Sequence, residues 1–224
     1  MGPDNYQITG DLAGATSRFV EQHYLGNDRP RSDAGMRVRL RPEERTDNGV
    51  VAVWTSGAAG DQNPVSAASG EDFTLVDALG KILGEAVLRA VSEVKMTSEV
   101  SIRGGQRVAT CPGRRVDPGP TPRAAYTFTD ADPVNIRLTL LTINDMALAG
   151  VSGEVFTQIG RRLSRESPLK PTVMVTHTNG SSGYIPSDDE FEPVSYEVTA
   201  SRLRPGCAEG AIVNGFLELI GPRR

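Results

Sequence analysis

Histidine, cysteine and aromatic residues are scarce in this sequence of 224 residues. There are two histidines, His23 and His177, and two cysteines, Cys111 and Cys207. No Cys-x-x-Cys pair and no Cys/His cluster is present, which excludes a zinc site built from these two residue types within the chain. Two cysteines are too few for a disulfide scaffold, and although they could pair, we expect two separate thiols. Because aromatic residues make up only 5%, the core must be built from Val, Leu, Ile and Ala.

Long apolar runs and an excess of basic residues are also lacking. No stretch approaches the roughly 18 apolar residues of a membrane helix. Residues 1–5 have neither the basic nor the apolar part of a signal peptide. The net charge of −4 disfavours a nucleic-acid binder, because such proteins neutralise phosphates with basic side chains. We therefore expect no transmembrane segment and no nucleic-acid partner, and the compartment is left open.

Glycine and proline are abundant, with 24 and 15 residues, and they indicate many turns between regular elements. Helical and strand-like patterns alternate between these turns, which predicts one domain of the α/β class over residues 1–224. The expected helices are 12–25, with Asp11 as N-cap, 72–94, 154–165 and 208–220. The expected strands are 36–40, 50–55, two strands within 134–151 that turn at 144–145, and 172–176, with a hairpin at 100–108 and an extended linker at 111–122.

Three apolar strands run directly into loops that carry small and polar residues. Asp61 follows the strand at 50–55, Glu154 follows the second strand within 134–151, and the loop from His177 to Tyr184 follows the strand at 172–176. If these strands are parallel neighbours, the polar groups converge at one edge of the sheet, where ligands bind in α/β proteins. Each residue also has a structural alternative: a turn or cap for Asp61, the dipole of a helix for Glu154, a backbone hydrogen bond for His177 and packing for Tyr184. The residues alone leave these alternatives open.

Four segments occur in an order that resembles the neutral (non-lysosomal) ceramidase family, in particular its bacterial branch. They are GAAGDQNP at 57–64, GVSGEVFTQIGR at 150–161, NGSSGYIP at 179–186 and the pair Tyr196-Glu197. The resemblance extends from about Ile8 to Ile220. It implies mixed β-sheets layered with helices, as in the second half of the ceramidase catalytic domain, without the immunoglobulin-like domain that follows it in larger members.

The resemblance also implies a zinc-dependent hydrolase of sphingolipid-type amides. In that family two histidines, one glutamate and one tyrosine hold the metal. The family glutamate matches Glu154, and the family tyrosine matches Tyr184, which lies five residues after Asn179. Carboxylate and phenolate oxygens are suitable zinc ligands, so the residues and the resemblance agree at these two positions.

This sequence departs from the family pattern in two respects. Asn63 stands where the family motif has its nucleophilic serine, so the expected nucleophile is zinc-activated water, with Asn63 or backbone N–H groups stabilising the oxyanion. The histidine motifs of the family have no counterpart here, and neither His23 nor His177 fits them. We therefore expect the zinc site to be completed by histidines outside this chain, in an upstream half that is a second chain or a missing segment.

Two hypotheses follow from these residues. The first is a subunit or fragment of a ceramidase-like amidase that acts on an N-acyl amide, with Glu154 and Tyr184 on the metal and Asp61, Asn63 and His177 as candidate catalytic residues. The second is a non-catalytic structural or binding subunit that retains the ceramidase-like fold.

Overall fold

The computed structural model describes residues 7–25, 50–63, 73–117, 126–192 and 195–221. It divides the chain into two compact units. The first comprises Met1–Trp54 and Pro64–Met96, and the second comprises Thr55–Asn63 and Thr97–Arg224. The strand expected at 36–40 lies outside the described residues.

The first unit contains two helices, α1 (Asp11–Tyr24) and α2 (Thr74–Ser92), as the sequence periodicity predicts. They pack closely because α2 has glycine at the two contact positions. A Cβ atom at Gly80 would collide with Ala15 of α1, and one at Gly84 would collide with Phe19. The expected N-cap was wrong by one position, since Asp11 is the first helical residue and Gly10 occupies the cap.

The segment 50–55 is extended but belongs to no strand, so the prediction of a buried strand was wrong. Val51 and Val53 are 73% and 80% exposed. An apolar run becomes a buried strand only if strands pair with it on both sides, and no described strand pairs with this segment. The Glu21 carboxylate instead accepts a hydrogen bond from the Ala52 backbone N–H at 3.0 Å.

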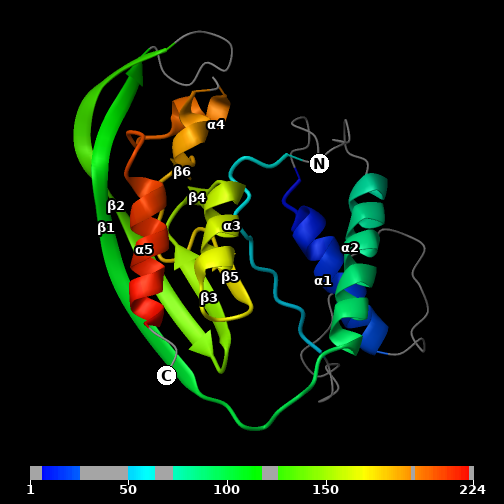
Figure 1. Ribbon diagram of the computed structural model, residues 1–224. Coiled ribbons are helices and arrows are strands. Elements are labelled where there is room, and N and C mark those ends of the chain that lie inside the picture. Colours follow the sequence, from blue (N-terminus) through cyan, green and yellow to red (C-terminus); the bar gives the residue numbers. More distant parts are fainter. Residues whose placement is uncertain (1–6, 26–49, 64–72, 118–125, 193–194, 222–224) are drawn as a thin grey trace. The chain divides into compact units, whose positions relative to one another are not determined.

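A four-stranded mixed sheet forms the centre of the second unit (Figure 1). Its strands are β1 (Ile102–Asp117), β2 (Thr127–Ile143), β3 (Met146–Val151) and β5 (Thr172–Val175), in the order β1-β2-β3-β5. Strand β2 is antiparallel to both β1 and β3, whereas β5 runs parallel to β3. The turn at 144–145 and the strand at 172–176 are thus confirmed.

Strand β1 corrects two expectations about residues 100–122. It passes straight through the glycines at 104 and 105 and pairs with β2 over nearly its whole length, so there is no hairpin at this point. Residues 111–117 continue the strand and are not a linker, with an irregularity in register between Cys111 and Gly113. Local turn signals were overridden because β2 offers a long pairing partner.

Helices α3 (Thr157–Glu166) and α5 (Ala208–Ile220) pack against the sheet of the second unit, in front of it in Figure 1. Their buried residues join the inward-facing residues of β1, β2, β3 and β5 in one core made chiefly of Ile, Leu, Val and Ala. Helix α3 begins three residues later than expected, because Glu154 lies in a short strand. The predicted α/β class with mixed sheets and layered helices is confirmed.

Smaller elements complete the second unit. Strands β4 (Glu154–Val155) and β6 (Tyr184–Ile185) form a separate parallel pair. A 3₁₀ turn, η2 (Asp188–Phe191), and the short helix α4 (Tyr196–Ala200) follow β6. Among the described residues, no helix is both long enough and apolar enough to cross a membrane.

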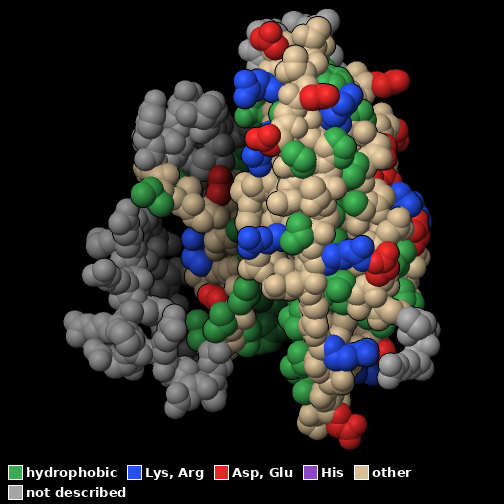
Figure 2. All heavy atoms as spheres, turned by 90° about the vertical axis from the view of Figure 1, so that its left-hand side faces the viewer, with side chains coloured by type: hydrophobic (Ala, Val, Ile, Leu, Met, Phe, Trp, Pro, Cys, Tyr) green, Lys and Arg blue, Asp and Glu red, His purple; other side chains and the backbone are tan. Residues whose placement is uncertain are grey.

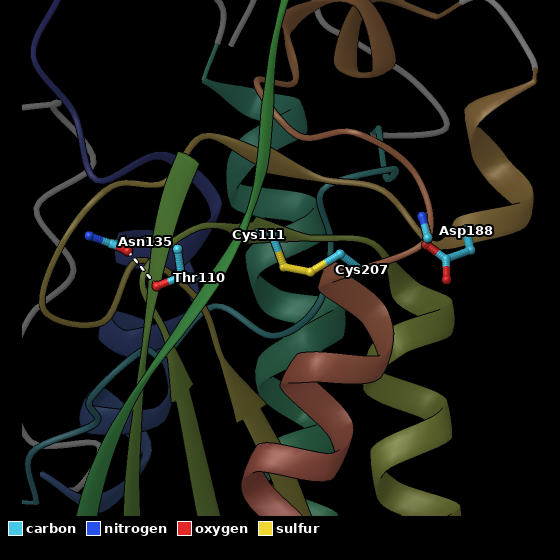
Figure 3. The surroundings of a disulfide bond; sticks show 6 residues. Thr110, Cys111, Asn135, Asp188 and Cys207 are labelled. Atoms are coloured by element: carbon cyan, nitrogen blue, oxygen red, sulfur yellow. Dashed lines mark hydrogen bonds between the residues drawn. A yellow bond between two sulfur atoms is a disulfide. The ribbon is translucent and has the colours of Figure 1, made fainter. Parts of the chain in front are cut away.

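A disulfide between Cys111 and Cys207 joins β1 to the residue before α5 (Figure 3), with Cα atoms 5.8 Å apart. The expectation of two separate thiols was therefore wrong. The two residues are 96 positions apart in the sequence, and only the packing of α5 on β1 brings them together. In the same region the Thr110 hydroxyl donates a hydrogen bond to Asn135 Oδ1 at 2.7 Å, between β1 and β2.

Ion pairs add to the contacts between β1, β2 and the C-terminal segment. Arg204 Nη1 lies 2.6 Å from Asp130 Oδ1, and Arg107 of β1 pairs with Glu218 of α5. Figure 2, which views the molecule from the β1 side, shows basic, acidic and hydrophobic side chains interspersed over this face. Exposed pairs of this kind contribute little to stability, so the disulfide and the apolar core hold α5 in place.

Candidate functional site

Two parallel strand pairs bring Glu154 and Tyr184 together. Strand β3 ends at Val151 and its parallel neighbour β5 ends at Val175, so the loops that follow them leave the sheet at the same edge. These loops lead into β4 and β6, in which Glu154 is the register partner of Tyr184. The expected convergence is therefore found for these two loops.

The side chains of Glu154, His177 and Tyr184 form one cluster. His177 Nε2 lies 3.7 Å from Glu154 Oε1, and Tyr184 is the register partner of Glu154 on the neighbouring strand. Burial of the phenol raises the pKa of Tyr184 above its ordinary value, and the negative charge and hydrogen bond of Glu154 raise this pKa further. The cluster stays open to solvent, because the His177 side chain is 54% exposed.

Tyr196 borders the cluster, although the sequence did not indicate it as a site residue. Its ring, at the start of α4, lies edge-to-face against the ring of Tyr184 with centroids 6.0 Å apart. The only signal for it was the Tyr196-Glu197 pair among the ceramidase-like segments. Such an aromatic contact fixes the plane of the Tyr184 ring.

Backbone hydrogen bonds hold the two loops against each other. The Glu154 N–H donates to the Gly183 carbonyl at 2.9 Å, and the His177 N–H donates to the Gly153 carbonyl at 3.3 Å. Gly153 is required, since a Cβ atom there would collide with the Gly183 carbonyl and the Ile185 side chain. His177 has φ 55° and Asn179 has φ 57°, in the left-handed region that residues with a side chain rarely adopt.

A pair of buried serines links the same loops. The hydroxyls of Ser152 and Ser182 lie 2.9 Å apart, and each serine precedes a cluster residue by two positions. Ser152 Oγ also accepts from the Arg137 N–H at 2.8 Å, and Ser182 Oγ donates to the Asn135 carbonyl at 3.0 Å. The pair anchors both loops to β2. In the sequence these serines are indistinguishable from exposed loop serines.

Asp61, in the 57–63 loop, contacts Thr157, the first residue of α3. Its Oδ1 accepts hydrogen bonds from the backbone N–H and the hydroxyl of Thr157, both at 2.8 Å. The N-cap residue of α3, Phe156, has no side-chain acceptor for the N–H groups of the first helical turn. Asp61 supplies such an acceptor for the Thr157 N–H. The neighbouring Gly60 N–H donates to the Val155 carbonyl at 2.9 Å. These contacts hold the 57–63 loop beside β4, and a role for Asp61 in catalysis stays a prediction.

Asn63 lies at the exposed end of this loop. Within the described residues it makes no hydrogen bond to Glu154, His177 or Tyr184, so the structure groups three of the five predicted site residues and leaves Asn63 apart. The sequence order could not reveal this division, because the strand expected before the loop does not form.

The chemistry of the cluster fits a zinc ion. A carboxylate, a phenol and an imidazole are all donors that zinc accepts. The described residues contain no group of three or more His, Cys, Asp and Glu side chains suited to a metal. Within the described residues, any further oxygen donor beside Glu154 would therefore have to be Tyr184, its register partner.

The chain matches no family model and no curated protein at the level of sequence. Its structure matches that of the neutral ceramidase from Pseudomonas aeruginosa with a TM-score of 0.62 and 13% sequence identity. The match covers 98% of this chain. The fold is ceramidase-like. A ceramidase complexed with C2 gives a similar match, with a TM-score of 0.61, 13% identity and 96% of this chain covered.

The ceramidase-like chain spans 41% and 42% of the lengths of these two solved ceramidases. At 13% identity the likeness establishes the fold alone. The activity of a ceramidase, its metal and its substrate therefore enter only as proposals for this chain.

Proposed function

We propose that this chain is part of a zinc-dependent, ceramidase-like hydrolase that cleaves an N-acyl amide bond. The observation that carries the proposal is the pairing of Glu154 with Tyr184 on neighbouring parallel strands of a ceramidase-like fold. Their oxygen atoms would hold the metal, and histidines from the remainder of the catalytic domain would complete the site. Zinc supplies Lewis-acid polarisation of a carbonyl and activation of water when it is bound in such a site.

The residues of this chain would hold and orient these groups. The Glu154 N–H bond to the Gly183 carbonyl fixes the backbone beside the carboxylate, and the ring of Tyr196 fixes the plane of Tyr184. Asp61 would act as a positioning residue, since it holds the 57–63 loop on α3. Asn63 and backbone N–H groups of that loop would stabilise the oxyanion of the cleaved amide.

The proposal is tested by co-producing the full chain with the polypeptide encoded immediately upstream and measuring zinc content and hydrolysis of a fluorogenic short-chain N-acyl amide. We expect zinc at near-stoichiometric level and activity that falls by at least about 100-fold in Glu154→Gln and Tyr184→Phe, because each change removes a metal ligand. Tyr24→Phe, an exposed phenol on α1, is the control. Absence of zinc from both the chain and the assembly would contradict the proposal.

A second candidate function is a non-catalytic structural or binding subunit. It is favoured by Asn63, which stands where the ceramidase motif has serine and lies apart from the cluster. An assembly that hydrolyses the amide equally well with Glu154→Gln and Tyr184→Phe would assign this role to the chain.

A further inference from the structure

Arg114 of β1 is a buried cation whose hydrogen-bond partners, in the part of the chain that the structure describes, are neutral oxygen atoms. The residue is 3% exposed. Its Nε donates to the Ser201 carbonyl and its Nη1 to the Tyr126 hydroxyl, each at 3.2 Å, and its Nη2 donates to the Val198 carbonyl. Removing a charge from water costs much free energy unless other groups replace its hydration. The guanidinium therefore stays buried only if the three acceptors stay in place.

Three aromatic rings also contact this guanidinium. The ring centroids of Phe191, Tyr126 and Phe128 lie 4.9, 5.3 and 5.4 Å from its Cζ atom. Ring faces attract a cation, and the attraction grows when water is excluded. A planar guanidinium with its N–H donors in a fixed fork fits beside flat rings and still reaches several oxygen atoms, whereas the ammonium of a lysine lacks this fork. The surroundings of Arg114 therefore hold it in one orientation.

Helix α4 depends on Arg114 for its position. A helix of five residues is not stable by itself, because so short a helix does not offset the free-energy cost of nucleation. Its N-terminal end is capped by Ser195, whose Oγ accepts from the Val198 N–H at 3.2 Å. Carbonyls at the other end need donors from outside the helix. Arg114 supplies these donors to Val198 and to Ser201, the C-cap residue.

Two contacts lead from this end of the helix to Tyr184 on β6, which lies next to α4 (Figure 1). The ring of Tyr196, the first residue of α4, lies edge-to-face on the ring of Tyr184. Ser201, whose carbonyl accepts from Arg114, donates its own hydroxyl to the Tyr184 carbonyl at 2.8 Å. Both the ring and the backbone of Tyr184 therefore rest on residues that Arg114 holds.

We propose that Arg114 is a positioning residue for Tyr184, which it holds through helix α4 and Ser201. The inference rests on the proposed function only for the part that Tyr184 plays in hydrolysis. Without the guanidinium fork, the core beneath α5 should stay folded while α4 loses its fixed position. The ring of Tyr184 would then move relative to its register partner Glu154.

The test labels the full chain with 3-fluorotyrosine and follows the fluorine resonance of Tyr184, which is assigned by its absence from Tyr184→Phe. Arg114→Lys keeps the charge but removes the fork, and should move this resonance by more than its linewidth. The resonance should also titrate at lower pH than in the parent, because water gains access to a phenol whose pKa is raised by burial. The resonance of Tyr24, on α1, should stay in place.

Arg115→Met is the matched control, because it removes the neighbouring, exposed arginine of β1. Its spectrum and titration should be those of the parent. Circular dichroism and the melting temperature establish that each variant is folded. If Arg114→Lys does not fold, Tyr126→Phe replaces it, since this change removes one acceptor of the guanidinium and keeps the ring. An unmoved Tyr184 resonance in the folded variant overturns the inference.

The assembly that tests the proposed function gives a second readout. There Arg114→Lys should lower the rate of amide hydrolysis by about 10-fold, as the loss of an outer partner does, and Arg115→Met should not change it. Unchanged hydrolysis in Arg114→Lys would also overturn the inference and leave the proposed function standing. An assembly without hydrolysis in which the Tyr184 resonance still responds to Arg114→Lys would contradict the proposed function alone.

Discussion

Tyr184 and Glu154 change each other's chemistry because they are register partners on β6 and β4. Removal of the phenol from water disfavours its charged form, and the neighbouring carboxylate disfavours it further. The raised pKa therefore keeps the proton on the phenol of Tyr184 over a wider range of pH.

The raised pKa of Tyr184 predicts a specific dependence of stability on pH. The folded state holds a proton that the unfolded state loses near pH 10, so this contribution is fully present below about pH 10 and is lost as the pH rises through the folded-state pKa. The difference in free energy of unfolding between the parent and Tyr184→Phe should be constant from pH 8 to 9 and shrink above pH 10. Denaturant titrations of the metal-free proteins measure it.

Tyr24→Phe serves as the control for these titrations, since it removes an exposed phenol from α1. Its curve should run parallel to that of the parent. A constant difference between the parent and Tyr184→Phe up to pH 11 would show that neither burial nor Glu154 raises the pKa of Tyr184.

At the scale of elements, the 57–63 loop and α3 depend on each other through Asp61. Helix α3 starts with backbone N–H groups that have no partner within the helix, and Asp61 supplies an acceptor from a segment about 96 positions earlier in the sequence. The loop in turn is held next to β4, where Glu154 lies. Stability and site geometry are thus coupled at this residue.

Asp61→Ala should lower the free energy of unfolding by about 1 kcal/mol, the usual effect of removing a helix cap. Asp61→Asn should retain most of the stability, because its amide oxygen can accept the bond from the Thr157 N–H. Chemical denaturation measures both variants, with Asp145→Ala in the β2–β3 turn as a control. Equal stability of Asp61→Ala and the parent would argue that the cap seen here contributes nothing.

At the scale of the whole molecule, the disulfide links two parts of the second unit that are far apart in the sequence. It joins β1 to the start of α5, and its two cysteines are 96 positions apart. A cross-link that closes so long a loop restricts the unfolded chain strongly and therefore favours the folded one.

Cys207→Ser should lower the free energy of unfolding by about 4.7 kcal/mol, the value expected for a loop of about 100 residues. A reducing agent should destabilise the parent by a similar amount and leave the double variant Cys111→Ser/Cys207→Ser unchanged. The measurement is denaturant unfolding followed by circular dichroism. If reduction leaves the stability of the parent unaltered, the disulfide does not form in the folded protein.

The match to ceramidases also belongs to this scale. Nearly the whole chain follows part of that fold, yet it spans less than half of either solved ceramidase.

Periodicity predicted the helices at 12–25, 72–94 and 208–220 because a helix requires only its own hydrogen bonds and an apolar stripe. It predicted the strands that bury at least one face in this chain. It failed for 50–55 and for β1, because pairing in a sheet depends on which partner strand is present.

The sequence by itself determined the α/β class, the polar loops after the strands and the ceramidase-like order of Glu154 and Tyr184. Only the tertiary structure decided that His177 lies beside Glu154, that Asp61 caps α3 and that the two cysteines pair. These facts depend on strand order and register, which bring distant residues together through many weak contacts at once. Spacing along the chain carries no information about such contacts, so the sequence could not reveal the partners of His177 or of the two cysteines.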